Sequence, residues 1–170
     1  MNRKERLSSC RLYGIADMGY TAEHQLISVT EKLLAGGLGI LQLRAKNHDP
    51  EHIARMGSRL APLCREYGCL FIINDYPEIA LGTGADGVHL GQDDGELAPV
   101  RAMLGANAII GRSTHSPEQA LGAFRERADY IGFGPSHGHQ AGKAGDRPGR
   151  HCRRAAAIAG RVSRLLHRRH

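Results

Sequence analysis

Six short apolar segments that favour β-strands recur along the chain, and stretches with helical spacing separate them. They comprise residues 12–16, 40–43, 70–73, 87–90, 108–111 and 130–133. Strands that alternate with helices are typical of βαβ units, so the pattern predicts an α/β fold with a parallel sheet. Two arrangements of the sheet fit this pattern, a doubly wound open sheet and an eight-stranded barrel. No GxGxxG motif follows the first segment and no GxxxxGK[ST] motif occurs, so a nucleotide-binding open sheet lacks its usual support.

One intervening stretch predicts a helix over residues 50–68. Its apolar residues recur at spacings of three and four and comprise Ile53, Met56, Leu60, Leu63 and Cys64. Asp49 is a good N-cap before Pro50 at the first helical position, and Gly68 is a good C-terminal stop. A further helix is predicted to begin at Ser116, which a proline and a glutamate follow.

Length and composition exclude several classes of protein. The 170 residues are 41% hydrophobic and 24% charged, as expected for one globular domain. No run of 18 uncharged apolar residues occurs, which excludes a transmembrane helix, and no apolar segment of a secretory signal follows the charged N-terminus. The cysteines form no CxxC pair and have no metal-ligand spacing; they are Cys10, Cys64, Cys69 and Cys152. We therefore expect free thiols in a reducing compartment, the cytoplasm.

The net charge of +6 is concentrated at one end of the chain. Residues 147–170 contain eight arginines and no acidic residue, so residues 1–146 carry a net charge of −2. Apolar residues of this tail recur at helical spacing, which predicts one stripe of a basic helix. A solvated or disordered arginine-rich end is the favoured interpretation, and nucleic acid is not an expected partner because the positive charge does not spread over a face of the fold.

Polar residues whose side chains could bind a ligand or take part in a reaction gather where the predicted strands end. They comprise Gln42, Arg44, Lys46, Asn74, Asp75, His89, Asp94, Ser113 and His115. The first three alternate along one strand and its extension, so they share a face. The carboxyl ends of parallel strands meet at one edge, where α/β barrels and open sheets place their sites. We therefore expect these side chains to lie close together.

The residue types in this set suit a phosphorylated substrate. An arginine and a lysine neutralise a phosphate or diphosphate, and the arginine does so through a forked contact. Two carboxylates, Asp75 and Asp94, are suited to hold a Mg²⁺ ion that bridges phosphate oxygens. No covalent nucleophile is evident. Simpler interpretations stay open for single residues: Asp75 as a turn residue, His89 as a hydrogen-bonded core histidine and His115 as an incidental loop residue.

Five segments together match a known pattern in order, spacing and content. They are QLRAK at 42–46, IINDY at 72–76, ADGVHLGQDD at 85–94, IIGRSTH at 109–115 and ADYIGFGP at 128–135. Over residues 11–135 the chain resembles the thiamine phosphate synthase family. The related thiazole tautomerase shares much of the pattern, including a GRS-x-H segment.

The resemblance implies a TIM-type (β/α)8 barrel and a cytoplasmic transferase of thiamine biosynthesis. Such an enzyme joins hydroxymethylpyrimidine diphosphate to thiazole phosphate and releases diphosphate. Carried onto this chain, the resemblance implies substrate contacts by Gln42, Arg44, Lys46, Asn74 and Ser113. It implies Mg²⁺ as the cofactor, with Asp75 and Asp94 as its ligands. Asp94 favours the synthase over the tautomerase, whose proton carrier would be His115, and His89 is a further candidate site residue.

The chain departs from this family after residue 135. The Thr-x-Thr-Lys segment that grips phosphate in the family is replaced, with His139 and Ala141 at the threonine positions and Gly142 at the lysine position. Lys143, one place further, is a candidate substitute. Beyond about residue 148 no family-like segment follows, and we interpret the chain as truncated or altered there.

The expected organisation therefore has three parts: an N-terminal extension over residues 1–10, an incomplete barrel of about six βα units over 11–148, and a basic helical or disordered tail over 149–170. An incomplete barrel exposes the edges of its first and sixth strands, which predicts self-association through them. A non-catalytic fragment with an anion-binding tail is the alternative function from a different class.

Overall fold

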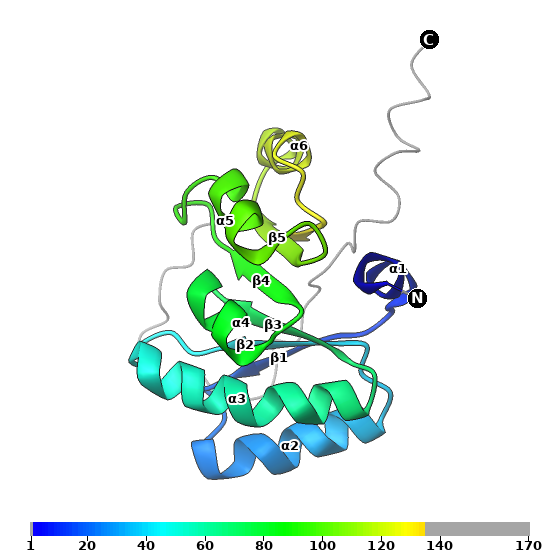
Figure 1. The fold of residues 1–170 in the computed structure, drawn as a ribbon, viewed down its shortest axis with the longest axis vertical. Helices are drawn as coiled ribbons and strands as arrows, with labels where there is room; N and C mark the ends of the chain where they lie inside the picture. Colours follow the sequence, from blue (N-terminus) through cyan, green and yellow to red (C-terminus); the bar gives the residue numbers. More distant parts are fainter. Residues whose placement is uncertain (1, 135–170) are drawn as a thin grey trace, which may run out of the picture.

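The computed structural model describes residues 2–134, which form six strands and six helices (Figure 1). The strands are β1 (Tyr13–Asp17), β2 (Ile40–Arg44), β3 (Leu70–Asn74), β4 (Gly87–Leu90), β5 (Ile109–Thr114) and β6 (Tyr130–Phe133). The helices are α1 (Arg3–Ser9), α2 (Glu23–Ala35), α3 (Pro50–Glu66), α4 (Pro77–Thr83), α5 (Leu97–Leu104) and α6 (Pro117–Arg125). The predicted segments begin within one residue of these strands, and β5 runs three residues further than predicted.

The six strands pair in parallel and in chain order, from β1 at one edge to β6 at the other. Each helix from α2 to α6 therefore connects neighbouring strands. This order excludes the doubly wound alternative, in which the strand order reverses at a switch point. The described residues form a half-barrel with an inner face and an outer face, as the prediction of about six βα units implies.

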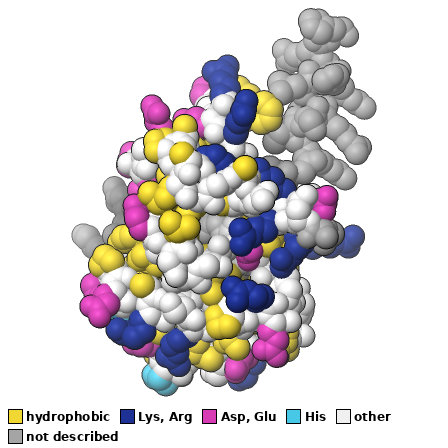
Figure 2. Space-filling model, viewed as in Figure 1, with side chains coloured by type: hydrophobic (Ala, Val, Ile, Leu, Met, Phe, Trp, Pro, Cys, Tyr) yellow, Lys and Arg dark blue, Asp and Glu magenta, His cyan; other side chains and the backbone are white. Residues whose placement is uncertain are grey.

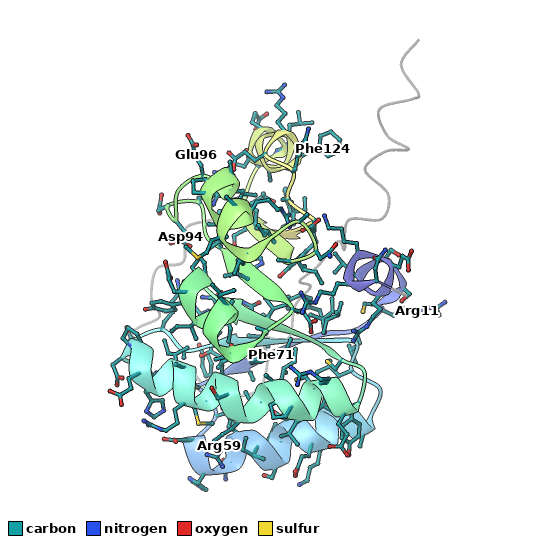
Figure 3. The ribbon with its side chains drawn as sticks, viewed as in Figure 1. Arg11, Arg59, Phe71, Asp94, Glu96 and Phe124 are labelled. Carbon is teal, nitrogen blue, oxygen red and sulfur yellow. The ribbon has the colours of Figure 1, made fainter. Side chains whose placement is uncertain are left out.

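The two faces of the sheet bury different apolar clusters. On the outer face Leu41 and Phe71 belong to the larger core, which includes residues of α2, α3, α4 and α5; Phe71 is labelled in Figure 3. On the inner face Ile40 and Leu70 belong to a smaller cluster with Leu7 of α1. Because side chains alternate along a strand, β2 and β3 are buried on both faces. Their nearly continuous apolar sequence follows from this double burial.

Helix α3 shows how local sequence sets the element boundaries. The Asp49 carboxylate accepts a hydrogen bond of 2.8 Å from the His52 amide, and Pro50 occupies the first helical position. The helix ends at Glu66, and Gly68 follows in the left-handed conformation with φ of 66°. Its buried residues include Ile53 and the other predicted apolar positions except Leu63, which is half-buried. The prediction for this helix is confirmed, except that the helix ends at Glu66, two residues before the predicted end at Gly68.

Helix α1 closes the amino end of the inner face. Leu7 is 5% exposed among the apolar side chains of β2, β3 and β5. Arg3 forms an ion pair of 2.7 Å with Asp86, and Lys4 forms one of 3.0 Å with Asp129. These two aspartates directly precede β4 and β6. The helix therefore attaches to two separate strand starts, which leaves the carboxyl ends of the strands as the polar opening of the inner face.

Residues 2–134 bear on the expected absence of a membrane-spanning helix, but not on the expectations for the C-terminal tail. Within residues 2–134 no helix is long and apolar enough to cross a membrane. Acidic and basic side chains are interspersed over the face shown in Figure 2. The expected basic tail over 149–170 and the candidate Lys143 lie outside the described residues.

Candidate active site

Polar side chains replace apolar ones on the inner face as the strands approach their carboxyl ends. Near the amino ends, Ile40, Leu70 and Ile109 surround Leu7. Towards the carboxyl ends the strands carry Asp17, Gln42, Arg44, Asn74, His89 and Ser113, and the segments that follow them carry Lys46, Asp75, Asp94 and His115. The structure thus brings every candidate within residues 2–134 to the same end of the sheet, where a parallel sheet places its binding sites.

A hydrogen-bonded chain links the first three strands across the inner face. Gln42 Nε2 donates to Asn74 Oδ1 at 2.5 Å, and Gln42 Oε1 accepts from the Tyr13 hydroxyl at 2.9 Å. Gln42 is only 3% exposed and Asn74 8% exposed. Buried amides are costly unless paired, so this chain holds both side chains in one orientation.

A second chain continues from β1 across the interior to β6, β4 and β5. The Tyr130 hydroxyl lies 2.8 Å from the Tyr13 hydroxyl, His89 Nδ1 lies 3.0 Å from the Tyr130 hydroxyl, and His89 Nε2 lies 2.9 Å from Ser113 Oγ. Because Tyr13 donates to Gln42, it accepts from Tyr130, which in turn accepts from His89 Nδ1. The free Nε2 lone pair of His89 then accepts from Ser113. Burial raises the pKa of both tyrosines, so their hydroxyls stay protonated.

Neither tyrosine is among the sequence-predicted site residues. Tyr13 shares the inner face of β1 with Asp17 at the period of two, and Tyr130 begins β6 directly after Asp129. The spacing in β1 is a signal that sequence reasoning could have used. The contact between Tyr13 and Tyr130 joins positions 117 residues apart, and no local pattern reports it.

Burial keeps His89 neutral and lowers its pKa to about 4. In the unfolded chain a histidine binds its proton near pH 6.5, so acid favours the unfolded state between these two values. We expect the free energy of unfolding to fall by up to about 3 kcal/mol from this group between pH 7 and pH 4.

Urea unfolding of the His89→Gln variant at pH 7 and pH 4.5 measures this linkage. The variant should show a clearly smaller loss of stability over the interval than the unaltered protein. His24→Gln, at an exposed position of α2, is the matched control and should keep the original loss. Equal losses in the two variants would contradict a neutral buried His89.

A salt bridge orients the arginine of the site. Arg44 Nη1 donates to Asp17 Oδ2 across the neighbouring ends of β1 and β2, which are in register at these residues. Arg44 stays one-third exposed, so the rest of its planar guanidinium faces the opening. Sequence reasoning did not select Asp17, although it ends the first predicted strand.

Two carboxylates approach each other at the ends of β3 and β4. Asp75 has a positive φ of 66°, and its amide donates to the His89 carbonyl at 2.9 Å. Asp94 lies in the loop between β4 and α5, labelled in Figure 3, and its Oδ2 accepts from the Gly91 amide at 2.5 Å. Burial and the Asp94 charge raise the pKa of Asp75, while the charges of Lys46 and Arg44 oppose this. Ionisation of Asp75 is therefore less favourable than that of a solvent-exposed carboxyl group.

A cavity of about 200 Å³ opens beside the hydrogen-bonded chain. His89, Ser113 and His115 contribute polar groups to its lining, and Ile15 and Phe133 contribute apolar surface. The His115 amide donates to Gln119 Oε1 at 2.6 Å, which ties this residue to the start of α6. The cavity can accept a small partly apolar ring next to the charged groups.

A larger hollow of about 960 Å³ lies away from this end, beside α1, α5 and α6. Of the two carboxylates in its lining, Asp129 is already neutralised by Lys4 at 3.0 Å and Arg101 at 2.6 Å, and Glu126 is the other. Buried polar side chains and the charges of Lys46, Asp75 and Asp94 instead lie together at the carboxyl end of the sheet, and we assign the site there.

Comparison with known proteins identifies the family. The sequence profile of the thiamine monophosphate synthase family matches residues 12–162. The chain belongs to this family. The thiamine-phosphate synthase of Synechocystis sp. is 41% identical over 144 residues, which cover 85% of this chain and 40% of that protein. The thiamine-phosphate synthase of Shouchella clausii is 43% identical over 125 residues, which cover 74% of this chain and 60% of that protein.

A solved structure of the same family supports the fold. Thiamine phosphate pyrophosphorylase from Pyrococcus furiosus superposes with a TM-score of 0.68 at 35% identity, over 78% of this chain and 62% of that one. The family prediction drawn from the five sequence segments is therefore confirmed. The chain spans about half the length of the curated relatives it matches.

Proposed function

We propose that this chain acts as a thiamine phosphate synthase, a transferase that joins hydroxymethylpyrimidine diphosphate to thiazole phosphate and releases diphosphate. The observation that carries the proposal is the convergence of two cations, Arg44 and Lys46, with the carboxylates Asp75 and Asp94 at one end of the sheet. The names of the relatives point to the same reaction.

The cationic side chains stabilise the leaving group. Negative charge develops on the diphosphate as its bond to the pyrimidine methylene carbon breaks. Arg44, held by Asp17, and Lys46 supply fixed positive charge where this negative charge grows. Such preorganised groups act more strongly on the transition state than on the ground state, which lowers the barrier.

The buried polar chain positions the rest of the substrate. Gln42 and Asn74 are fixed by each other and by Tyr13, and Ser113 is fixed by His89. These groups are neutral, so they orient a polar ring without opposing a positive charge on its methylene carbon. The neutral state of His89 serves the same purpose. Capture of this carbon by the thiazole nitrogen completes the transfer.

A magnesium ion fits the residues present at this site. Asp75 and Asp94 provide two hard oxygen ligand groups, and burial together with the Asp94 charge raises the pKa of Asp75. Within residues 2–134 no cluster of three or more possible ligand residues occurs. Mg²⁺ usually keeps several waters and is bound by one or two carboxylates plus substrate phosphates. When bound, Mg²⁺ supplies further neutralisation of the diphosphate.

Magnesium is therefore expected to stabilise the folded protein. Because the pKa of Asp75 is raised in the folded protein, the free energy of unfolding falls as the pH rises through this pKa and Asp75 ionises. At pH 7.5, 10 mM MgCl2 should raise the melting temperature by roughly 2–5 °C relative to NaCl of equal ionic strength. Asp75→Asn should remove this difference, and a persistent shift in that variant would place the ion elsewhere.

The assay that tests the function follows both products. The chain is incubated with the two phosphorylated precursors and Mg²⁺, and thiamine phosphate and diphosphate are quantified together. Equal formation of both supports the proposal. Conversion of a thiazole isomer without diphosphate release would instead support the tautomerase alternative, with His115 as the proton carrier. No product from folded protein would favour the non-catalytic alternative.

We also propose that the half-barrel belongs to a TIM-type (β/α)8 architecture and that its edges mediate self-association. Within residues 2–134, β1 and β6 each pair with one neighbour. Leu12, Ile15 and Phe133 beside these edges are 53%, 50% and 43% exposed. Apolar surface next to an unpaired edge favours contact with a second copy.

Analytical ultracentrifugation at tens of micromolar protein is expected to show species larger than a monomer. Leu12→Lys should shift the distribution towards the monomer. Leu33→Lys, on the exposed face of α2, is the control and should leave the distribution unchanged. A single monomeric species would overturn the self-association proposal.

The free thiols of Cys10, Cys64 and Cys69 support the further proposal of a cytoplasmic location.

A further inference from the structure

The end of α3 places two cysteines against each other in the larger core. The Cys69 amide donates to the Cys64 carbonyl at 2.8 Å, and the Gly68 amide donates to the Arg65 carbonyl at 3.1 Å. With Gly68 in the left-handed conformation, this pair of hydrogen bonds is a Schellman motif. Side chains at the positions of Cys64 and Cys69 contact each other in this motif. An apolar pair usually occupies these positions, whereas here both side chains are thiols.

The two thiols differ in acidity because they interact. The interaction between the two neighbouring thiols raises the pKa of Cys64 and lowers that of Cys69, and the Cys69 thiol also lies 3.6 Å from the Leu70 carbonyl. The Arg6 charge also lowers the pKa of Cys69, while burial and the Asp86 charge oppose this. Cys69 is thus the better nucleophile and Cys64 the thiol that remains protonated.

A cavity of about 420 Å³ reaches the end of this motif. Its lining includes Arg6, Cys10, Tyr67 and Gly68, the residue before Cys69. Arg6 donates to the Gly68 carbonyl at 2.6 Å, and no atom lies within 4 Å of a Cβ built on Gly68. The cavity is large enough for a molecule of the size of hydrogen peroxide and ends at Gly68, next to Cys69, while Cys64 and Cys69 themselves are at most 1% exposed.

We propose that Cys64 and Cys69 are a redox-active pair that closes to an intramolecular disulfide on reaction with a peroxide. The Cys69 thiolate sulfur attacks one peroxide oxygen, the O–O bond breaks, and Cys69 sulfenic acid and water form once the leaving hydroxide takes a proton. The Cys64 sulfur then attacks the Cys69 sulfur, the S–O bond breaks, and a second water leaves with the Cys64 proton. The two sulfurs supply the two electrons that reduce the peroxide.

The disulfide joins the last turn of α3 to the residue directly before β3 without a large rearrangement of the backbone. The carbonyl–amide contact already holds the two residues opposite each other, which suits the short Cα separation that a disulfide requires. Cys10 is the competing thiol, because its charge interacts with that of Cys69. Burial and this interaction raise the pKa of Cys10, which disfavours its reaction.

Peptide mapping of the folded full chain after peroxide treatment tests the proposal. After alkylation and tryptic digestion, Cys10, Cys64 and Cys69 lie in separate peptides, residues 7–11, 60–65 and 66–101. We expect the linked pair 60–65 with 66–101, lighter by two hydrogen atoms than the two thiol peptides, and full alkylation of 7–11. A thiol reductant should restore alkylation at both linked positions.

Other results would overturn the proposal. A link between 7–11 and 66–101 would assign the reaction to Cys10 and Cys69, and links to residues 151–153, which hold Cys152, would indicate unselective oxidation. Oxidation in urea supplies the pattern of unselective pairing. Cys10→Ser should leave the link unchanged, whereas Cys64→Ala should abolish it and leave Cys69 as a sulfenic or higher acid. If Cys64→Ala folds poorly, peptide mapping of the unaltered chain still tests the proposal.

Discussion

The Asp75→Asn variant is expected to form thiamine phosphate at least about 100-fold more slowly than the unaltered chain, since removing one preorganised group at developing charge costs about 10²–10³-fold in rate. Asp75 combines a site position with a φ of 66°. Asparagine tolerates this left-handed conformation, so the substitution removes the charge without adding backbone strain. The rate should fall because Asp75 and Asp94 no longer form a pair that attracts a divalent cation.

Initial rates at saturating Mg²⁺ and both precursors measure this effect. Asp93→Asn is the matched control, because Asp93 is an exposed carboxylate directly beside Asp94. This control should keep the rate within about two-fold, as expected for an exposed substitution of small energetic effect. A comparable loss in both variants would indicate a general electrostatic effect of the loop. An unchanged rate in Asp75→Asn would remove Asp75 from the proposed site.

Replacing Gly87 by alanine is expected to remove most of the stability of the fold. A Cβ at this first residue of β4 would lie 1.8 Å from the Ile109 carbonyl oxygen and 2.6 Å from its carbonyl carbon. Both atoms belong to the backbone of the paired strand β5, so no side-chain rotation relieves the overlap. The two strands must separate where β3, β4 and β5 form the middle of the sheet. We expect a loss above about 4 kcal/mol, against a typical total of 5–15 kcal/mol.

Urea unfolding followed by circular dichroism measures the loss in Gly87→Ala. Gly122→Ala is the control, because Gly122 lies in α6 and no atom lies within 4 Å of a Cβ built there. Alanine in a helix interior is better than glycine by roughly 0.5–1 kcal/mol, so this variant should gain stability. If Gly87→Ala unfolds within 1 kcal/mol of the unaltered protein, the close approach of β4 and β5 is not part of the folded state.

Much of the local structure could be predicted from sequence because it depends on neighbours along the chain. The predicted helix over residues 50–68 is confirmed, since Asp49, Pro50 and Gly68 act through backbone groups a few residues away. The strand segments are confirmed within one residue at their starts, since strands buried on both faces need continuous apolar residues. The clustering of Gln42, Arg44 and Asp75 at one end also follows from sequence, because parallel strands align their carboxyl ends.

Sequence reasoning selected the family and most of the candidate residues, but not the groups that hold those residues in place. Asp17 pairs with Arg44, and Tyr13 and Tyr130 connect Gln42 to His89, yet each is an ordinary strand residue when its own segment is read alone. Their partners lie on other strands, and the side-chain period of two says only which face a residue shares. The resemblance implied a set of substrate contacts without implying these supporting residues.

The sequence alone determined the α/β class, the strand positions, the helix over residues 50–68, the family and the set of charged residues at the strand ends, because each depends on short-range periodicity or on a contiguous motif. The folded structure alone showed that α1 closes the inner face, that Gly87 lies against β5 and that Tyr13 meets Tyr130 across the interior. These features depend on how far the sheet curves and on which side chains then come within contact distance. Curvature accumulates over all six strands, and no short segment of the chain encodes it.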